Sequence, residues 1–182
     1  MSHGLVLSGT FHIRAVAPDG SVEEEVVRNG ITDQGLTQAL QNIVHVDQSN
    51  IISLYFGLIS NTSFTGTSQS DTHASHSGWT EHTANIDNAT RPAWSVTGQP
   101  DIPVMSNEHV SLATITFTAV VAGTTHPVDS IIRGLFLATT NTLGSTSSSF
   151  KLWSTGLFDM PRRFRPGTVL TIKYVLTALE RE

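Results

Sequence analysis

Apolar and polar residues alternate with a period of two at the start of the chain. From Leu5 to Ala15 every second residue is apolar or glycine, and most residues between them are polar. This alternation predicts a β-strand with one buried face. Pro18–Gly20 predicts a tight turn, and Glu23–Val27 predicts the returning strand, which Asn29 and Gly30 end. The chain is therefore expected to begin with an antiparallel hairpin.

A helical spacing follows this hairpin. Apolar residues recur at intervals of four, three and one, at Leu36, Leu40, Ile43 and Val44. This spacing predicts a short helix with one apolar face, capped by Thr32 or Asp33. No other segment predicts a helix convincingly.

The rest of the chain is dominated by apolar stretches of strand length. They are Ile51–Ile59, Val110–Val121, Ile131–Ala138, Phe150–Phe158 and Val169–Leu179. The first of them is apolar on both sides, as expected for a central strand of a sandwich. Turn-rich segments at 61–67, 139–149 and 161–167 separate the stretches. The pattern predicts an all-β fold, a β-sandwich or jelly roll with one short helix, as a single domain over 1–182.

The segment SDTHASHSGWTEHTANIDNATRPAW, from Ser70 to Trp94, has neither helical nor strand periodicity. It lies within a long loop around 61–109 and contains two of the three Trp and three of the eight His. Long irregular connections are usually functional or disordered, and disordered segments are seldom rich in Trp. We therefore expect an ordered loop that packs on its own domain or on a neighbour.

Composition narrows the function classes. The chain has no Cys, which excludes thiol catalysis, thiolate metal sites and disulfides. Its net charge of −5 disfavours nucleic-acid binding, because phosphate contacts need a basic surface. No apolar stretch is long enough to cross a bilayer, so no membrane contact is expected. Only 14% of the residues are charged. A surface of hydroxyls and amides favours a protein packed against copies or partners.

The histidines of the loop allow two interpretations. His73, His76 and His82, with Asp71 nearby, are adequate ligands for zinc or nickel. However, their spacing matches no helical or strand geometry that arranges three ligands in advance. A structural or surface role is favoured over a metal site, and no cofactor is expected.

Catalytic motifs are missing from the sequence. It contains no G-x-S-x-G elbow and no phosphate-binding G-x-x-x-x-G-K-[ST] loop. The carboxylates of the loops have no sequence context that separates their pKa values, so a glycosidase pair is weakly supported. The protein is therefore not expected to be an enzyme.

Two groups of residues are candidates for a partner interface. Trp79 and Trp94 either anchor a subunit interface or plug the sandwich, or they form a stacking platform for sugars; the first interpretation is favoured. Arg162, Arg163 and Arg165 place three of the ten basic residues within four positions. They either lie in a solvated turn or bind an acidic partner surface or the Glu23–Glu25 run of a neighbouring copy.

Seven phrases in fixed order carry a family resemblance. They are NGITDQGL (29–36), LYFGLI (54–59), SDTHASHSGWTEHT (70–83), ATRPAW (89–94), ATITFTA (113–119), IIRGLFLAT (131–139) and LWSTGLF (152–158). In this order they resemble a family of virion structural proteins of tailed bacteriophages, over roughly 29–179. The resemblance implies a capsid decoration, or cement, protein on the exterior of the head.

The partners implied by the resemblance are the major capsid protein and further copies of this chain, expected as a trimer. Tail and fibre proteins share part of the same pattern. The alternative is therefore a receptor-binding module of the tail that recognises host glycans with the Trp79 and Trp94 loop. The family supplies no catalytic residues for this chain.

Overall fold

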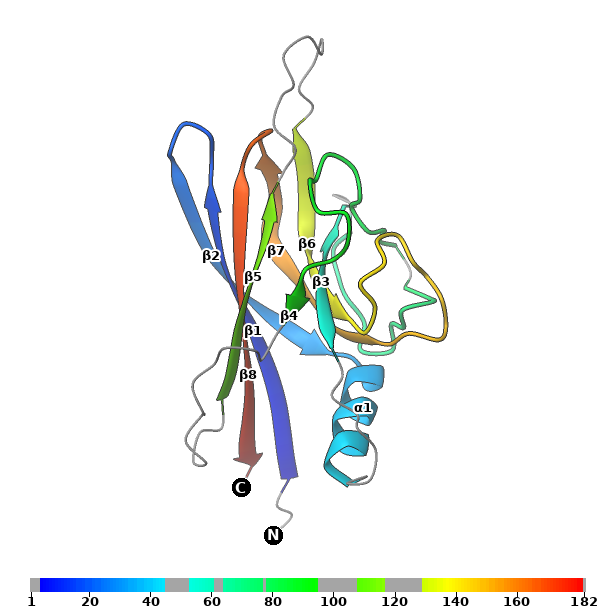
Figure 1. Cartoon of the computed structure of the whole chain (residues 1–182). Coiled ribbons are helices and arrows are strands. Elements are labelled where there is room, and N and C mark those ends of the chain that lie inside the picture. The colour runs from blue at the N-terminus through cyan, green and yellow to red at the C-terminus, as the bar shows by residue number, and fades with distance from the viewer. Residues whose placement is uncertain are drawn as a thin grey trace.

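The computed structural model describes residues 4–44, 53–60, 64–76, 78–94, 108–116 and 129–181. Within these residues the chain forms eight strands and one helix. In order they are β1 (Gly4–Val16), β2 (Val22–Ile31), α1 (Asp33–Val44), β3 (Leu54–Ile59), β4 (Ala93–Trp94), β5 (Glu108–Thr116), β6 (Ser130–Ala138), β7 (Leu152–Phe164) and β8 (Val169–Arg181) (Figure 1). The predicted residues 51, 52 and 117–121 of two strands lie outside the described ranges.

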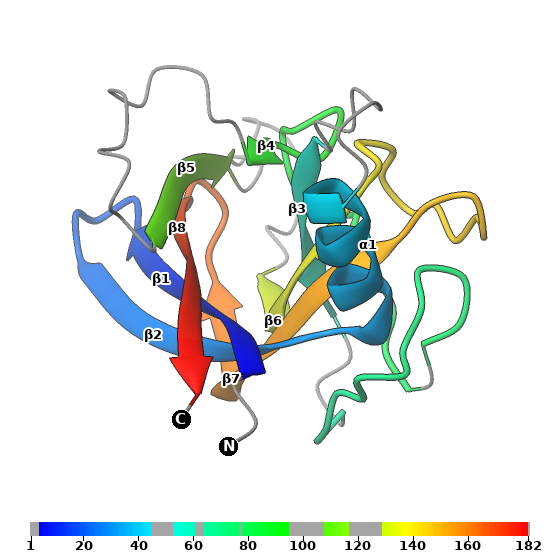
Figure 2. The ribbon, with the colours of Figure 1, turned by 90° about the horizontal axis from the view of Figure 1, so that it is seen from below.

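The strands form one antiparallel sheet in the order β4-β3-β6-β7-β2-β1-β8-β5. The sheet divides into two halves at the pairing of β2 with β7, which covers only Gly30 with Thr155 and Ile31 with Ser154. Viewed from below, the two halves curve round a common interior (Figure 2). By contrast, β1 and β8 pair along their whole length, from Gly4 with Arg181 to Val16 with Val169.

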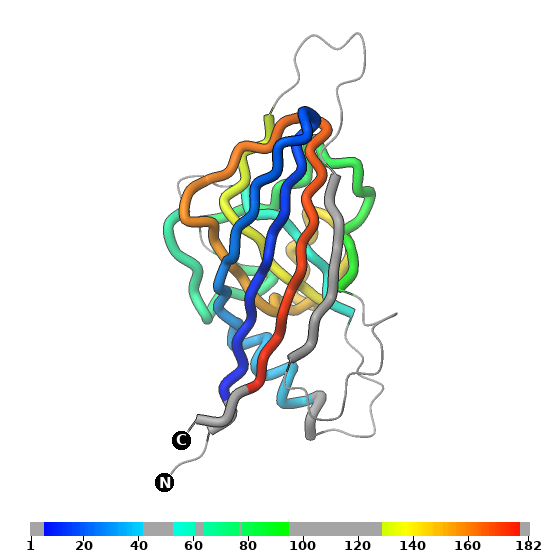
Figure 3. The backbone as a smooth tube through the Cα atoms, turned by 90° about the vertical axis from the view of Figure 1, so that its left-hand side faces the viewer, coloured from blue at the N-terminus to red at the C-terminus, as the bar shows by residue number. Residues whose placement is uncertain are grey.

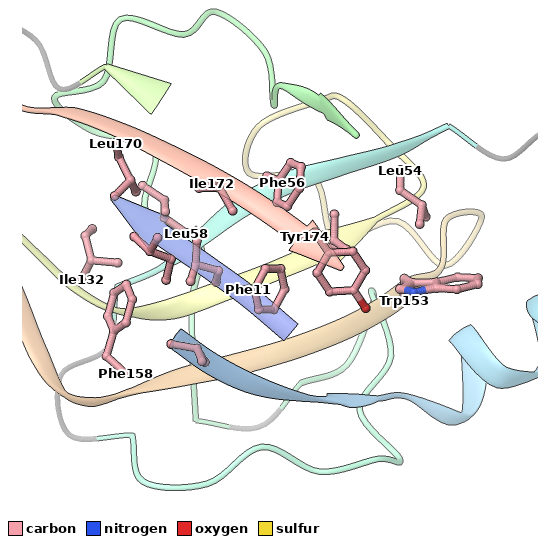
Figure 4. Close-up of a cluster of buried hydrophobic side chains, with 14 of the residues drawn as sticks. Phe11, Leu54, Phe56, Leu58, Ile132, Trp153, Phe158, Leu170, Ile172 and Tyr174 are labelled. Atoms are coloured by element: carbon pink, nitrogen blue, oxygen red, sulfur yellow. The ribbon is translucent and has the colours of Figure 1, made fainter. Parts of the chain in front are cut away.

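Aromatic rings from both halves fill this interior. Phe11 of β1 and Tyr174 of β8 meet Phe56 of β3, with ring centroids 6.2 and 6.5 Å from Phe56. All three side chains are fully buried, and Figure 4 shows them at the centre of the cluster. Two facing β-layers around one apolar core are a sandwich. The prediction of an all-β sandwich-like fold with one short helix is confirmed.

The β3–β6–β7 layer is buried on its outer side as well. Ile59, Trp79, Phe136, Ala138 and Leu152 form a second cluster there, separate from the core between the layers. Gly57 lets this cluster pack closely, because a Cβ at that position would lie 2.1 Å from the Phe136 ring. Burial on both sides explains why the segment up to Ile59 is apolar at nearly every position.

The helix begins as the sequence predicts. The hydroxyl of Thr32 accepts a hydrogen bond from the backbone N–H of Gly35 at 3.1 Å, so Thr32 is the N-cap. The same hydroxyl donates to the backbone carbonyl of Leu152. A Cβ on Gly35 would come within 2.3 Å of the Trp153 carbonyl oxygen. The cap and this close approach together fix α1 against β7.

The predicted turn at 161–167 is partly wrong, because β7 continues to Phe164. The pairing with β6 shifts between Ile132 and Gly134, which face Arg162 and Leu157. Four residues of β7 therefore bulge opposite Arg133, and Pro161 lies in the bulge, where the ladder does not need its missing N–H. Arg162 and Arg163 accordingly belong to a strand, and only Arg165 belongs to the turn.

Candidate functional site

Two loops cover the outer side of the β3–β6–β7 layer, residues 64–92 and residues 139–151 (Figure 1, right). The first loop returns along the edge of β3 that faces away from β6, beyond the short pairing with β4. The backbone N–H of Ser60 donates to the Thr80 carbonyl at 3.0 Å. The N–H of His82 donates to the Leu58 carbonyl at 2.8 Å. The loop predicted from its Trp and His content therefore packs on its own sheet.

A buried ion pair within the first loop binds the backbone of the second loop. Arg91 donates from Nε and Nη2 to the two carboxylate oxygens of Glu81, at 2.7 and 2.8 Å. The side chains are only 1% and 7% exposed. Arg91 also donates from Nη1 to the Thr140 carbonyl at 2.9 Å, and the Gly144 N–H donates to Glu81. We call these four residues the loop clasp, because they hold the loops together by charge-assisted hydrogen bonds.

His73 lies against the loop clasp. Its Nδ1 is 3.0 Å from the Ser147 carbonyl oxygen. A carbonyl only accepts, so Nδ1 carries the proton and Nε2 offers its lone pair to the Nη1 N–H of Arg91 at 3.4 Å. Burial lowers the pKa of His73, and the positive charge of Arg91 lowers this pKa further. A neutral imidazole suits this position, since protonation would place two donors face to face.

The loops enclose a pocket of about 210 Å³. Phe136 and Leu152 of the sheet line it together with an aromatic pair in which the imidazole of His76 stacks on Trp79, with centroids 3.7 Å apart and planes inclined by 19°. The Nδ1 of His76 lies 3.0 Å from the Trp79 carbonyl oxygen, which holds the imidazole in place. Hydroxyl side chains from both loops complete the wall, namely Thr80, Thr83, Ser145 and Thr146.

The structure separates the residues that the sequence analysis considered as metal ligands. His73 and His76 share the pocket, whereas His82 bonds through Nε2 to the Ser130 hydroxyl at 3.1 Å. Asp71 accepts from the Ser68 N–H in a turn of its own loop. Across the described residues no group of three or more His, Asp or Glu is placed to hold a metal ion.

The sugar platform of Trp79 and Trp94 is not formed. Trp79 is 4% exposed and belongs to the outer cluster. Trp94, on β4, packs on the core between the layers, with its ring edge-on to Tyr174 at 5.7 Å. The two Trp rings thus belong to separate clusters, Trp79 to the outer cluster and Trp94 to the core between the layers.

Each arginine of the predicted interface cluster has an acidic neighbour within this chain. Arg162 donates to Glu25 at 2.8 Å and lies 3.8 Å from Glu23. Arg163 pairs with Asp129, and Arg165 pairs with Asp19 at 3.1 Å. Glu23 and Glu25 of the acidic run, which was one of the two alternatives for a contact with a neighbouring copy, thus pair with Arg162 of the same molecule.

Glu81 and Arg91 were not singled out by the sequence as a pair. Both lie in the quoted phrases, and each is a charged residue in a segment otherwise rich in hydroxyls and small side chains. Arg91 is the one Lys or Arg of this loop, which also contains the three carboxylates of Asp71, Glu81 and Asp87. A single cation in a predicted ordered loop favours an ion pair, but the sequence does not say which carboxylate is the partner. No local sequence pattern predicts the hydrogen bond from Arg91 to the Thr140 carbonyl, since the two residues are 49 positions apart.

Comparisons with known proteins add no relative. The chain matches no protein-family model, and neither the curated proteins nor the solved structures contain a significant match. Among the described parts of the chain, no helix is both long and apolar enough to span a membrane.

The buried His73 and the partly buried His82 predict a loss of stability in acid. Burial lowers the pKa of both His73 and His82 in the folded state. Below about pH 6.5 the unfolded chain therefore binds protons that the folded chain does not. The contribution of these two histidines to the free energy of unfolding is expected to be constant above this pH. It should fall as the pH drops towards their pKa values in the folded state.

Urea denaturation at a series of pH values measures this effect. His73→Asn keeps a donor for Ser147 but does not titrate, so its free energy of unfolding should fall less steeply with acid than that of the wild type. A variant with the same slope as the wild type would show that His73 has no part in the acid sensitivity.

Proposed function

We propose that this protein is a non-enzymatic structural protein of a tailed-phage virion, a decoration protein that binds the outside of the capsid as a trimer. The order of seven sequence phrases supports the family. The observation that carries the binding mode is the outer face of β2, β1 and β8, which lie side by side in Figure 3.

This outer face has apolar side chains that no part of the described chain covers. Val22, Val16 and Val169 form a row across the three strands. Val22 is 47% exposed and Val26, further along β2, is 60% exposed. Exposed β-branched side chains on a broad sheet face are typical of contact surfaces between proteins. The apolar faces of β3 do not add to this argument, since loops of the same chain cover the outer one.

A decoration protein stabilises the head by adding contact area across the joints between capsid subunits. A standard interface buries about 1,600 Å². Threefold symmetry lets one trimer contact several lattice subunits at once, so that a modest affinity per contact gives strong attachment. Nothing is turned over in this mechanism, and the fold supplies a rigid surface.

Co-sedimentation with expanded, undecorated heads tests the proposal. The wild type should sediment with the heads and should be trimeric by light scattering. Val22→Glu combined with Val26→Glu should weaken head binding by at least about tenfold, because two carboxylates would be desolvated in the contact. Ser148→Glu, on the loop at the other side of the molecule, is the matched control and should bind like the wild type.

Two outcomes would contradict the proposal. A wild type that ignores heads and sediments with tails would support the receptor-binding module of the tail instead. Equal head binding by the double variant and the control would exclude the outer face of β2, β1 and β8 as the contact surface.

A further inference from the structure

The carboxylate and the guanidinium that line the pocket between the two loops form an ion pair and leave no unpaired charge for a ligand. Among the described residues that line the pocket, the carboxylate of Glu81 and the guanidinium of Arg91 neutralise each other at 2.7 Å. His73 is kept neutral by burial, as its contact with Arg91 requires. An ionic ligand would lose its hydration without gaining a counter-charge. The pocket therefore favours a neutral ligand.

The walls of the pocket have two kinds of surface. The stacked rings of His76 and Trp79, with Phe136 and Leu152, provide an apolar side. Hydroxyls and backbone from both loops provide a polar rim. Sugar rings match this division, because their C–H faces pack on aromatic rings while their hydroxyls form hydrogen bonds around the edge.

The size of the pocket limits the ligand to one ring. The pocket has a volume of about 210 Å³. Pockets for drug-sized ligands begin at roughly 300 Å³. A single pyranose fits this volume, whereas an oligosaccharide would place only its terminal residue inside.

We propose that the pocket between residues 64–92 and 139–151 binds one neutral pyranose residue, with the sugar ring packed on the imidazole of His76 and the sugar hydroxyls bonded to the rim. This proposal rests on the pocket alone and does not depend on binding to phage heads. Such a site would let the protein attach to neutral surface glycans while its outer sheet face serves another contact.

Saturation-transfer NMR tests the proposal with methyl glycosides of glucose, galactose and mannose, and with glucuronic acid as the charged comparison. At least one neutral glycoside should bind with a Kd of about 1 mM, as expected for a ligand of this size. Glucuronic acid should bind more weakly. The absence of a saturation-transfer signal from all three neutral glycosides at about 10 mM would overturn the proposal, and so would tighter binding of glucuronic acid.

A matched pair of variants locates the binding. Thr146 and Ser148 are both exposed on the same loop, but only Thr146 lines the pocket. Thr146→Trp should fill the entrance and weaken glycoside binding by at least about tenfold, whereas Ser148→Trp should bind like the wild type. Equal binding by both variants would place the sugar elsewhere and overturn the proposal. Head binding by Thr146→Trp should be unchanged, which keeps this result separate from the proposed virion role.

Discussion

Replacing Arg91 with Met is expected to lower the free energy of unfolding by about 3–5 kcal/mol. The change leaves the carboxylate of Glu81 in the interior, where its side chain is 7% exposed, with no cation to offset its lost hydration. It also removes the donor to the Thr140 carbonyl and the guanidinium that lies 5.0 Å from the centre of the Phe136 ring. Urea denaturation followed by tryptophan fluorescence measures the loss.

Arg163→Met is the matched control for this variant. Arg163 also pairs with a carboxylate, that of Asp129, but its own side chain is 74% exposed. Exposed pairs contribute only about 0–1 kcal/mol, so this control should be nearly as stable as the wild type. Changing Glu81 to Met together with Arg91 removes both buried charges and should recover part of the loss. If Arg91→Met cost no more than Arg163→Met, the loop clasp would have no role in stability.

Trp79→Ala is expected to cost about 3–5 kcal/mol, the range for deleting a buried aromatic side chain. The indole lies 5.2 Å from Phe136 and is stacked by His76, so its removal leaves a cavity in the outer cluster. The same urea measurement tests this prediction. Trp94→Ala should cost less, since Trp94 is only half-buried beside the core.

Near-ultraviolet circular dichroism shows which part of the molecule the Trp79 variant loses. The core between the layers, around Phe11 and Tyr174, does not include Trp79 and should keep its signal. A Trp79→Ala protein as stable as the wild type would contradict the packing role and leave Trp79 as a residue of the ligand pocket alone.

Local patterns were enough to predict much of the fold. The alternation from Leu5 to Ala15 depends only on neighbouring residues, as does the Thr32 cap of α1, and both are found in the structure. The extent of β7 could not be predicted, because Pro161 and Arg162 read locally as a turn. Arg162 instead pairs with Ile132, some thirty positions earlier in the chain, and Pro161 lies in the bulge beside this pair.

The candidate site was predicted only in outline. The concentration of His and Trp identified the loop, and His73, His76 and Trp79 do lie in one pocket. Trp94 looked equivalent in the sequence, yet it packs on the other cluster. The side of the layer on which each Trp ring packs depends on the path of residues 80–94 beside β3. No periodicity within the loop predicts that path.

The full-length pairing of β1 with β8 has a consequence for how the molecule folds. Gly4 must find Arg181, and Val16 must find Val169, across almost the whole length of the chain. Contacts so distant in sequence are slow to form, since a large loop must close before any of them stabilises the product. During synthesis the edge of β1 that pairs with β8 therefore stays unpaired until β8 has left the ribosome. Overexpression is expected to yield aggregates in proportion to the time that this edge remains open.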